Sequence, residues 1–370
     1  MENTNQSVAQ DIQATTRLAL HLLDRVEKMT SDLSEAADET GASAPDPQDV
    51  EVDRMLEEAL YKISRISENR SMSLDLQSMD SLIVRLCERV QEMADAQTAV
   101  TGILTGFFEL DRMTTGMRAG DLIVLAARPG MGRSALAMNI AGHVALKKNQ
   151  PVAVFSMSMG AISWATCMIS AIGRINTNNL STGRLTDEEW VLLPETVERL
   201  RGVDLYIDET SGLTFIELSA KARRLKRQCG DKLGLIVVDC LQMMNDASNG
   251  NKTRATDLGE ISRNLKELAQ RLHCQVIALS QLHSDIDARA DKRPLVSDLQ
   301  EFGTIADAAD LIMFLYRDDY DNENAPEPSM AEVIIAKQRN GPTGTVPLVF
   351  VKSRMRFENL IPMTDAGDDF

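Results

Sequence analysis

The stretch DLIVLAARPGMGRSALAMNIAGHVAL, residues 121–146, combines three local patterns that together decide the fold. It begins with an apolar run typical of a buried strand, passes through a turn with two glycines, and ends in a run with helical periodicity. A strand, a glycine-containing turn and a helix in this order are the context that a phosphate-binding loop requires. In such a loop, backbone N–H groups and the helix N-terminus point toward phosphate. The stretch therefore predicts a nucleotide-binding site at the end of a strand.

The predicted loop departs from the usual GxxxxGK[ST] pattern at two positions. Ala127 stands where the first glycine belongs, and Arg133 stands where the lysine belongs. A guanidinium keeps the positive charge but is planar and larger than an ammonium, so Arg133 is not a conservative replacement beside the β- and γ-phosphates. A chance glycine turn is therefore the alternative interpretation of this stretch taken alone.

Ser134 is expected to place its hydroxyl on Mg²⁺, as the serine or threonine of such loops does. The residues predicted to surround the nucleotide are Ala127, Arg128, Pro129, Gly130, Met131, Gly132, Arg133 and Ser134.

Further along the chain, short β-rich runs alternate with helical stretches. Most of these runs lack strict apolar and polar alternation, which is typical of strands buried on both faces. We therefore expect an α/β fold with a mostly parallel central sheet flanked by helices. The predicted strands are DLIVLAA (121–127), VAVFSM (152–157), DLYID (204–208), LGLIVVD (233–239), CQVIALS (274–280), DLIMFLY (310–316) and AEVIIAK (331–337).

Polar residues end two of these strands. Asp239 closes LGLIVVD, where a carboxylate at the carboxyl edge of the sheet can hold a Mg²⁺-bound water. Ser280 and Gln281 follow CQVIAL, and they are expected to sense the γ-phosphate at the same edge. Together with the glycine turn, these residues favour a nucleotide site over a chance loop.

The N-terminal quarter has a different composition. SEAADETGASAPDPQD (34–49) is polar, acidic and contains proline, so it is expected to be a flexible linker. Apolar residues recur at helical spacing before it (18–29) and after it (52–66 and 76–93). These helices either pack on their own domain or dock on a neighbouring subunit, and the sequence leaves both open.

Charge and composition exclude some classes of protein. The net charge is −16, of which −11 falls in residues 1–100 and −5 in the remaining 270, so a basic loop could still meet phosphate there. The five cysteines and four histidines form no zinc or disulfide pattern. Because there is no signal sequence and no apolar run near 18 residues, we expect a cytoplasmic protein without membrane contact.

Eight stretches occur in an order and at a spacing that resemble the DnaB family of replicative DNA helicases, over roughly residues 52–360. They are TGILTGFFELDRMTTGMRAGDLIVLAARPGMG (101–132), RINTNNLSTGRLTDEEW (174–190), LYIDETSGLT (205–214), LIVVDCLQMM (235–244), VIALSQL (276–282), RADKRP (289–294), AADLIMFLYRDD (308–319) and IIAKQRNGPTGTV (334–346).

The resemblance implies a domain organisation. It implies an acidic N-terminal extension (1–50), partly disordered, in place of the family's globular N-terminal domain. A helical linker region follows (51–100), in which VDRMLEEALYKISRI (52–66) docks on the adjacent subunit. A RecA-like ATPase domain (101–362) and an acidic tail (363–370) complete the chain.

The resemblance also implies roles for single residues. ATP and Mg²⁺ are its cofactors, with Ser134 and Asp239 on the metal side and Gln281 as γ-phosphate sensor. Lys337 and Arg339 match the pair that reaches the neighbour's nucleotide as a trans-acting finger, which makes hydrolysis depend on ring assembly. The resemblance implies single-stranded DNA as a partner, contacted by Arg289, Lys292 and Arg293; a solvated basic turn is the alternative interpretation of these three residues.

The sequence departs from the family mainly at chemical positions. Ser158, in SMSM, stands where the family has a glutamate that polarises the attacking water, and loss of a positioned base typically costs about 10²- to 10⁴-fold in rate. Three basic positions on the presumed DNA side are also lost, at 283–284, 300–303 and Pro347. Arg133 and Ser158 together predict weak hydrolysis, whereas the lost basic positions predict a weaker salt dependence of DNA binding.

Three functional hypotheses follow. The first is a DnaB-like helicase, a hexameric ring that translocates on single-stranded DNA during replication, with a primase or helicase loader as a further partner. The second is a catalytically impaired homologue that binds nucleotide and serves as a structural or regulatory subunit of a related helicase ring. The third is another RecA-type ATPase, because a shared core fold does not set function.

Overall fold

The computed structural model describes residues 78–95, 102–245, 254–282, 286, 289, 291–320, 329–339 and 341–360. The predicted linker at 34–49, the apolar stripes at 18–29 and 52–66 and the acidic tail lie outside these residues. The chain divides into two compact units, Met1–Leu86 and Cys87–Phe370. The second unit contains all the predicted site residues.

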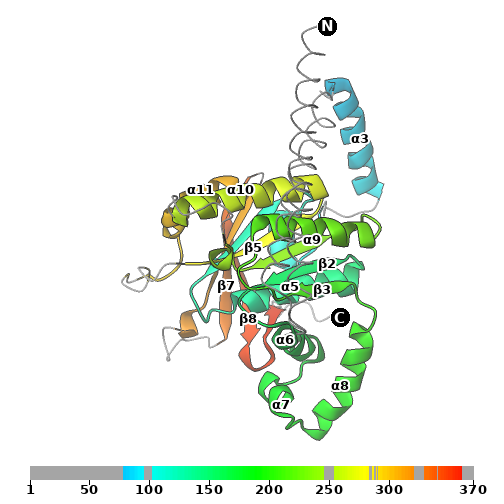
Figure 1. The fold of residues 1–370 in the computed structure, drawn as a ribbon, viewed down its shortest axis with the longest axis vertical. Helices are drawn as coiled ribbons and strands as arrows, with labels where there is room; N and C mark the ends of the chain where they lie inside the picture. Colours follow the sequence, from blue (N-terminus) through cyan, green and yellow to red (C-terminus); the bar gives the residue numbers. More distant parts are fainter. Residues whose placement is uncertain are drawn as a thin grey trace, which may run out of the picture. The chain divides into compact units, whose positions relative to one another are not determined.

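A nine-stranded sheet with the order β3-β2-β4-β5-β1-β6-β7-β8-β9 forms the centre of this second unit (Figure 1). The six strands from β3 to β6 are parallel to one another, as the apolar runs predict. Their bounds are β1 Leu122–Ala127, β2 Val152–Ser156, β3 Leu205–Asp208, β4 Leu235–Asp239, β5 Gln275–Gln281 and β6 Leu311–Tyr316. All seven predicted strands are present, since β7 (Met330–Gln338) coincides with the last of them.

The last three strands run antiparallel and include two that the sequence analysis missed. β7 pairs with β6, β8 (Gly344–Val351) with β7, and β9 (Arg356–Asn359) with β8. Burial alternates along β7 and along most of β8, because one face of this part of the sheet is only partly covered. The sheet is therefore mostly parallel, with an antiparallel extension at one side.

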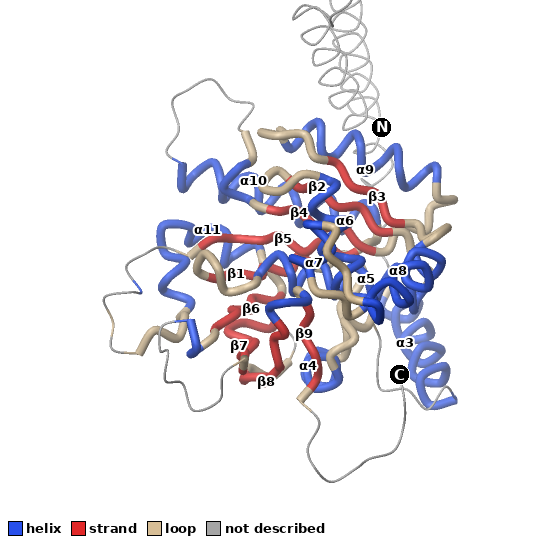
Figure 2. The backbone as a smooth tube through the Cα atoms, turned by 90° about the horizontal axis from the view of Figure 1, so that it is seen from below, coloured by secondary structure: helices blue, strands red, loops and turns tan. Residues whose placement is uncertain are grey.

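Helices cover both faces of the sheet, as Figure 2 shows with α9, α10 and α11 on one side of the strands and α5 on the other. Alternate residues of β1 point to the two layers. Ile123 and Leu125 pack with residues of α5 and α6, whereas Leu122 and Val124 pack with residues of α9 and α10. The helix bounds are α5 Arg133–Lys148, α6 Ala161–Gly173, α9 Phe215–Gln228, α10 Arg254–Leu272 and α11 Gly303–Ala308.

Three further helices belong to this unit: α4 (Phe108–Thr114), α7 (Thr177–Thr182) and α8 (Asp187–Leu200). α8 begins with a capping box in which the Thr186 hydroxyl accepts from the Glu189 N–H and the Glu189 carboxylate accepts from the Thr186 N–H. The same carboxylate accepts from the backbone N–H of Asn176, the N-cap residue of α7. Glu189 therefore connects the starts of α7 and α8.

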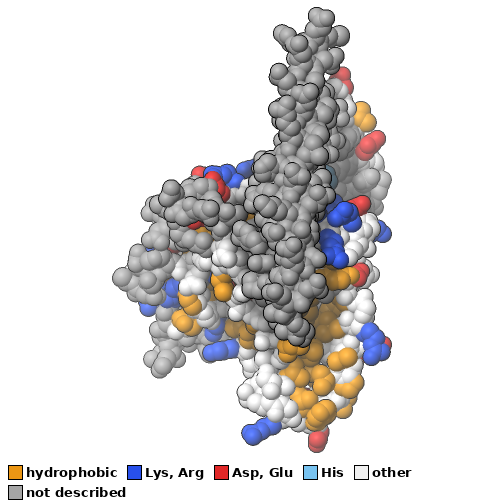
Figure 3. Space-filling model, viewed as in Figure 1, with side chains coloured by type: hydrophobic (Ala, Val, Ile, Leu, Met, Phe, Trp, Pro, Cys, Tyr) orange, Lys and Arg blue, Asp and Glu red, His pale blue; other side chains and the backbone are white. Residues whose placement is uncertain are grey.

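Hydrophobic side chains gather on the surface formed by α6 to α8 (Figure 3). Because large exposed apolar patches on a soluble domain often mark binding surfaces, we define this set as the α6–α8 apolar surface. Its large exposed members are Ile162, Trp190, Val191, Leu192 and Val197.

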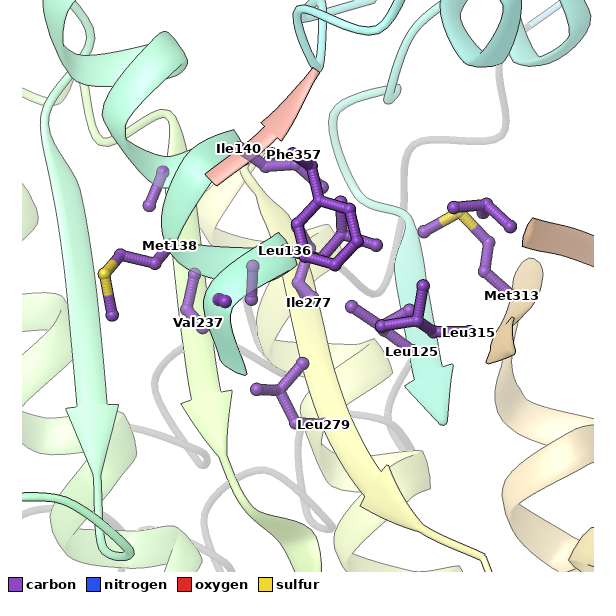
Figure 4. Packing of buried hydrophobic residues seen from close by; sticks show 14 of the residues in the cluster. Leu125, Leu136, Met138, Ile140, Val237, Ile277, Leu279, Met313, Leu315 and Phe357 are labelled. Atoms are coloured by element: carbon purple, nitrogen blue, oxygen red, sulfur yellow. The ribbon is translucent and has the colours of Figure 1, made fainter. Parts of the chain in front are cut away.

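Buried side chains beneath α5 hold the start of this helix in place, and the phosphate loop lies directly before that start. Leu136 and Ile140 of α5 lie among side chains of five strands and are fully buried (Figure 4). Their partners in the figure are Leu125 of β1, Val237 of β4, Ile277 and Leu279 of β5, Met313 and Leu315 of β6, and Phe357 of β9. The helix start is thus held rigidly beside the carboxyl edge of the sheet.

The apolar stripe predicted at 76–93 forms α3 (Met79–Asp95), which spans the division between the two units. Its large apolar side chains, such as Met79, Ile83, Leu86 and Val90, are exposed. None of the helices in the described part of the chain is long and apolar enough to cross a membrane.

Candidate nucleotide-binding site

The turn between β1 and α5 has the backbone of a phosphate-binding loop. Gly130 and Gly132 have φ values of 80° and 98°, a region that side chains make costly. A Cβ on Gly130 would lie 2.7 Å from the Tyr320 ring, and one on Gly132 would lie 3.2 Å from the ring of Phe350. Both the backbone conformation and the close packing therefore require glycine at these two positions.

The start of α5 leaves its first N–H groups available. Gly132 is the N-cap residue, and no side chain caps this end of the helix. The first N–H groups of a helix have no partner within it, so an uncapped end beside a glycine turn favours an anion. Met131 is buried in the core and Pro129 is exposed, so the loop is anchored on one side and open on the other. Ala127 is the last, fully buried residue of β1.

Asp239 and Arg133 form an ion pair beside the loop. The Arg133 Nη2 lies 3.7 Å from Oδ1 of Asp239, and the side chains are 14% and 0% exposed respectively. Among the residues that the structure describes, neither carboxylate oxygen has a hydrogen-bond partner, and neither does Nε of Arg133. Burial also raises the pKa of the adjacent Cys240 thiol, against the opposing charge of Arg133. The pair therefore lies in a poorly hydrated environment.

Gln281 lies directly beside the start of the loop. It pairs in register with Ala127 at the carboxyl end of β5, and its side chain is exposed. Gln242 holds the carboxyl end of β5 in place. Its Nε2 donates to Ser280 Oγ (2.9 Å) and its Oε1 accepts from the Gln281 N–H (3.1 Å). Sequence reasoning missed Gln242. Its place three residues after Asp239, in VVDCLQ, was the available signal.

Ser158 lies at the same edge of the sheet. It follows β2, which pairs with β4 so that Ser156 is opposite Asp239. The Ser158 side chain is exposed. A hydroxyl at this position cannot act as a carboxylate base near neutral pH. The loop, Asp239, Gln281 and Ser158 thus follow four neighbouring strands at one edge.

Lys337 and Arg339 lie at the opposite edge of the sheet. In the antiparallel pairing of β7 with β6, Gln338 is opposite Leu311, which is at the amino end of β6. Lys337 Nζ donates to the Ala306 carbonyl at 2.6 Å, and Arg339 Nη1 lies 3.2 Å from Oδ1 of Asp310. The predicted finger residues are therefore far from the phosphate loop of their own chain.

The three predicted DNA contacts occur in one segment, and carboxylates pair with two of them. Arg289 Nη2 donates to Asp298 Oδ2 at 2.8 Å. Arg293 binds Glu332 through two nitrogens, at 2.9 and 2.6 Å, and also lies over the Tyr316 ring. Lys292 is partly buried. A phosphate would have to compete with these carboxylates for both arginines.

The site has groups that could face the phosphates of a nucleotide and groups that could face its metal ion. The two oxygens of Asp239 are buried acceptors without a hydrogen-bond donor, which suits a metal-bound water. Ser134 follows in the first turn of α5. The Arg133 guanidinium, however, is the cation now beside this carboxylate. The residues fit nucleotide phosphates directly, and Ser134 and Asp239 are the residues that would hold a metal ion there.

A mostly parallel sheet, a phosphate loop after β1, and acidic and amide side chains after the adjacent strands define a RecA-like P-loop domain. Within that class, the chain belongs to the DnaB-like helicase C-terminal domain family, which it matches over residues 102–359. This membership confirms the predicted resemblance and excludes the alternative of a different RecA-type ATPase.

Replicative DNA helicases are similar over most of the chain. Replicative DNA helicase DnaB of Geobacillus stearothermophilus is 44% identical over 310 residues, which are 84% of this chain and 68% of the relative. Replicative DNA helicase DnaB of Pasteurella multocida is 40% identical over 344 residues, 92% of this chain and 73% of the relative.

Two solved structures share the fold. One is an isolated ATPase domain that is 36% identical with a TM-score of 0.74, covering 78% of this chain and all of that domain. The other is a DnaB-like replicative helicase, studied with its interactions with primase, which is 31% identical with a TM-score of 0.74, covering 92% of this chain and 76% of that one.

Proposed function

We propose that this chain is a subunit of a ring-shaped replicative DNA helicase that binds ATP and moves on single-stranded DNA, with weak hydrolysis of its own. The observation that carries the proposal is the division of its site residues between two edges of one sheet. The phosphate loop, Asp239 and Gln281 occupy the carboxyl edge, whereas Lys337 and Arg339 occupy the amino edge. A second copy is needed to bring both sets to one nucleotide.

The exposed apolar residues support assembly. The α6–α8 apolar surface and the exposed apolar residues of α3 are available for contacts between copies of the chain or with a related helicase subunit. Membership of the family and the similarity to replicative helicases favour a hexameric ring. A primase or a helicase loader is the proposed further partner, supported by the solved relative that was studied with primase. The cytoplasm is the proposed location.

Weak hydrolysis follows from two substitutions in the chemical machinery. In phosphoryl transfer, cations stabilise charge on the transferred group and a positioned base or water-orienting group directs the nucleophile. Arg133 changes the first component, and Ser158 removes a carboxylate from the second. ATP and Mg²⁺ remain the proposed cofactors, with Ser134 and Asp239 as the residues that would face the metal. When bound to phosphates, Mg²⁺ supplies charge neutralisation.

In a second candidate function, the chain has the same fold and the same site but does not hydrolyse ATP. In it, the chain binds nucleotide and serves as a structural or regulatory subunit beside an active helicase. The ion pair between Arg133 and Asp239 favours this alternative, because it ties two groups of the hydrolytic centre to each other.

Steady-state ATP hydrolysis with single-stranded DNA tests the proposal. We expect turnover below about 1 s⁻¹, the low end of typical enzymes. Arg133→Lys together with Ser158→Glu should raise the rate about 10²-fold or more, because a positioned carboxylate base and a compact ammonium are restored. Turnover of the unaltered chain at tens per second would contradict the weak-hydrolysis proposal.

Controls separate the two functions. Arg201→Lys, at an exposed arginine paired with Glu198, should leave the rate unchanged. A higher rate of ATP hydrolysis in the double variant, followed by loss of that gain when Arg339→Ala is added, would support a helicase subunit whose site is completed by a neighbour. If the double variant binds nucleotide but gains no turnover, the structural or regulatory function is favoured instead.

A further inference from the structure

Arg133 contacts Asp239, although a cation at this position of a nucleotide loop is expected to face phosphate. Arg133 is the first residue of α5, and its guanidinium lies 3.7 Å from the Asp239 carboxylate at the end of β4. This distance is that of an ion pair and is too long for a normal hydrogen bond. The carboxylate is fully buried and has no hydrogen-bond partner in the described part of the chain. The guanidinium therefore compensates the charge of Asp239 but leaves both of its oxygens open.

A buried carboxylate needs a counter-charge, since its transfer from water is costly when it stays ionised and unpaired. In a metal-dependent site, the hydrated metal bound to phosphates provides that charge. Here the protein itself provides it through Arg133. A divalent cation close to Asp239 would face the positive guanidinium, and the two cations would repel each other across a poorly hydrated space.

Arginine suits a shared position better than lysine does. Its planar group carries five N–H donors in a fixed fork, so it can face a carboxylate on one side and phosphate oxygens on another. Arg133 follows Gly132 directly, at the helix end where phosphate is expected. Nε of Arg133 has no hydrogen-bond partner among the described residues and is available for such a second contact.

We propose that Arg133 is a built-in counter-cation, shared between Asp239 and the phosphates of a bound nucleoside triphosphate, so that nucleotide binding by this chain depends little on Mg²⁺. The inference rests on the proposed nucleotide binding and concerns affinity, whatever the rate of hydrolysis. It assigns to one side chain part of the charge that a divalent cation otherwise supplies.

Equilibrium binding of a fluorescent, non-hydrolysable ATP analogue to the full chain tests this inference. Fluorescence anisotropy would be titrated with excess Mg²⁺ and again with excess EDTA. For the unaltered chain we expect the two dissociation constants to differ by less than about 3-fold, below the tenfold that corresponds to 1.4 kcal/mol. In Arg133→Lys, removal of Mg²⁺ should weaken binding about tenfold or more. Arg201→Lys is the matched control and should behave as the unaltered chain.

The outcomes separate the inference from the proposed function. Loss of binding in EDTA by the unaltered chain, or an equal Mg²⁺ dependence in both proteins, would overturn the inference and leave the nucleotide site intact. Absence of saturable binding under both conditions would overturn the nucleotide site and the inference together.

A second readout avoids reliance on one variant. Free Mn²⁺ would be measured by electron paramagnetic resonance in the presence of the analogue. The unaltered chain should retain Mn²⁺ about tenfold more weakly than Arg133→Lys does, because the forked guanidinium can stay paired with Asp239 while it contacts phosphate, whereas a single ammonium cannot serve both groups and leaves the carboxylate to the ion. Asp239→Asn should keep metal-free nucleotide binding, since Arg133 is then released toward phosphate. Loss of that binding in a folded Asp239→Asn protein, judged by circular dichroism, would contradict the shared position of Arg133.

Discussion

Gly132 shows how one residue position links the fold to the site. Its φ of 98° starts α5 in the direction that exposes the first amides of the helix, and the stacked rings of Phe350 and Phe357 pack behind it. Both rings belong to β8 and β9, the strands that the sequence analysis missed. The antiparallel extension of the sheet therefore supports the phosphate loop from behind.

Substitution of Gly132 by alanine should destabilise the protein and weaken nucleotide binding. The positive φ alone costs about 1–2 kcal/mol for a residue with a Cβ, and the two rings must also move. Gly202→Ala is the matched control, since Gly202 has a φ of 76° with no atom within 4 Å of the position that a Cβ would take. Urea unfolding of both variants measures the difference. An equal loss of unfolding free energy in the two variants would show that the rings of Phe350 and Phe357 do not restrict the side chain at position 132.

The sequence predicted which groups lie at the carboxyl edge of the sheet, but it could not predict which side chains they contact within one chain. Asp239, Gln281 and the glycine turn follow strands that the apolar runs reveal, so their common edge was predictable. The contact of Arg133 with Asp239 and that of Arg293 with Glu332 join residues far apart in the sequence. Side-chain pairs of this kind depend on packing, which a single sequence does not specify.

At the scale of elements, buried strands were easier to predict than exposed ones. The parallel strands are continuous apolar runs, so their positions were clear. β8, in contrast, alternates and contains Pro347, which weakens a strand prediction, and β9 has only four residues. The capping box before α8 was also missed, although TDEE at 186–189 carries the Thr-x-x-Glu signature.

The capping box predicts an acid-sensitive element. Hydrogen bonds from the backbone of Thr186, then from Asn176 and Asn179, hold the pKa of Glu189 at about 2, below its ordinary value of 4.5. Because the pKa is lowered in the folded chain, the stabilisation is complete above pH 4.5 and is lost as the pH falls toward 2. Hydrogen exchange at the starts of α7 and α8 should rise over this interval.

Two variants check the role of this carboxylate. Glu189→Gln should show faster exchange already at neutral pH and little further change on acidification, because the charged acceptor is gone. Glu188→Gln removes a neighbouring charge and should match the unaltered chain. Unchanged exchange in Glu189→Gln would contradict the role of Glu189 in joining the two helix starts.

The ion pair between Arg293 and Glu332 predicts that removal of the Glu332 charge strengthens DNA binding. Glu332 holds Arg293 by two hydrogen bonds, so Glu332→Gln should release the guanidinium toward DNA. Affinity for single-stranded DNA should rise, and the slope of log K against log salt should steepen by about 0.7 for one added phosphate contact. Glu358→Gln makes the same charge change beside Arg356 and should have no such effect. Identical slopes in the two variants would indicate that Arg293 lies in a solvated turn away from DNA.

At the scale of the whole molecule, exposed apolar residues are concentrated on a few helices. Val191, 72% exposed within the α6–α8 apolar surface, lies beside Trp190 and Leu192. A surface of this kind on a soluble domain is typical of subunit contacts. The sequence predicted assembly only through the resemblance, because periodicity does not reveal which helical faces remain exposed after folding.

A charge on this surface should disrupt assembly. Val191→Asp is expected to shift the protein from oligomer to monomer in sedimentation velocity, since burial of an unpaired carboxylate costs several kcal/mol. Leu360→Asp places the same charge at an exposed apolar residue outside the surface and should leave the mass unchanged. Retention of the oligomer by Val191→Asp would place the subunit contact elsewhere.

The separation of the phosphate loop from Lys337 and Arg339 gives each copy two unlike ends. Contacts between such ends are head-to-tail, so they close into a ring or continue as a helical filament. Under the proposed completion of each site by a neighbour, an open row of copies would leave the loop of its first member without Lys337 and Arg339 of another copy, and Lys337 and Arg339 of its last member without a loop. Under that proposal, only a closed ring would give every copy a complete site, and a gap opened to load DNA would inactivate the site at the gap but not the others.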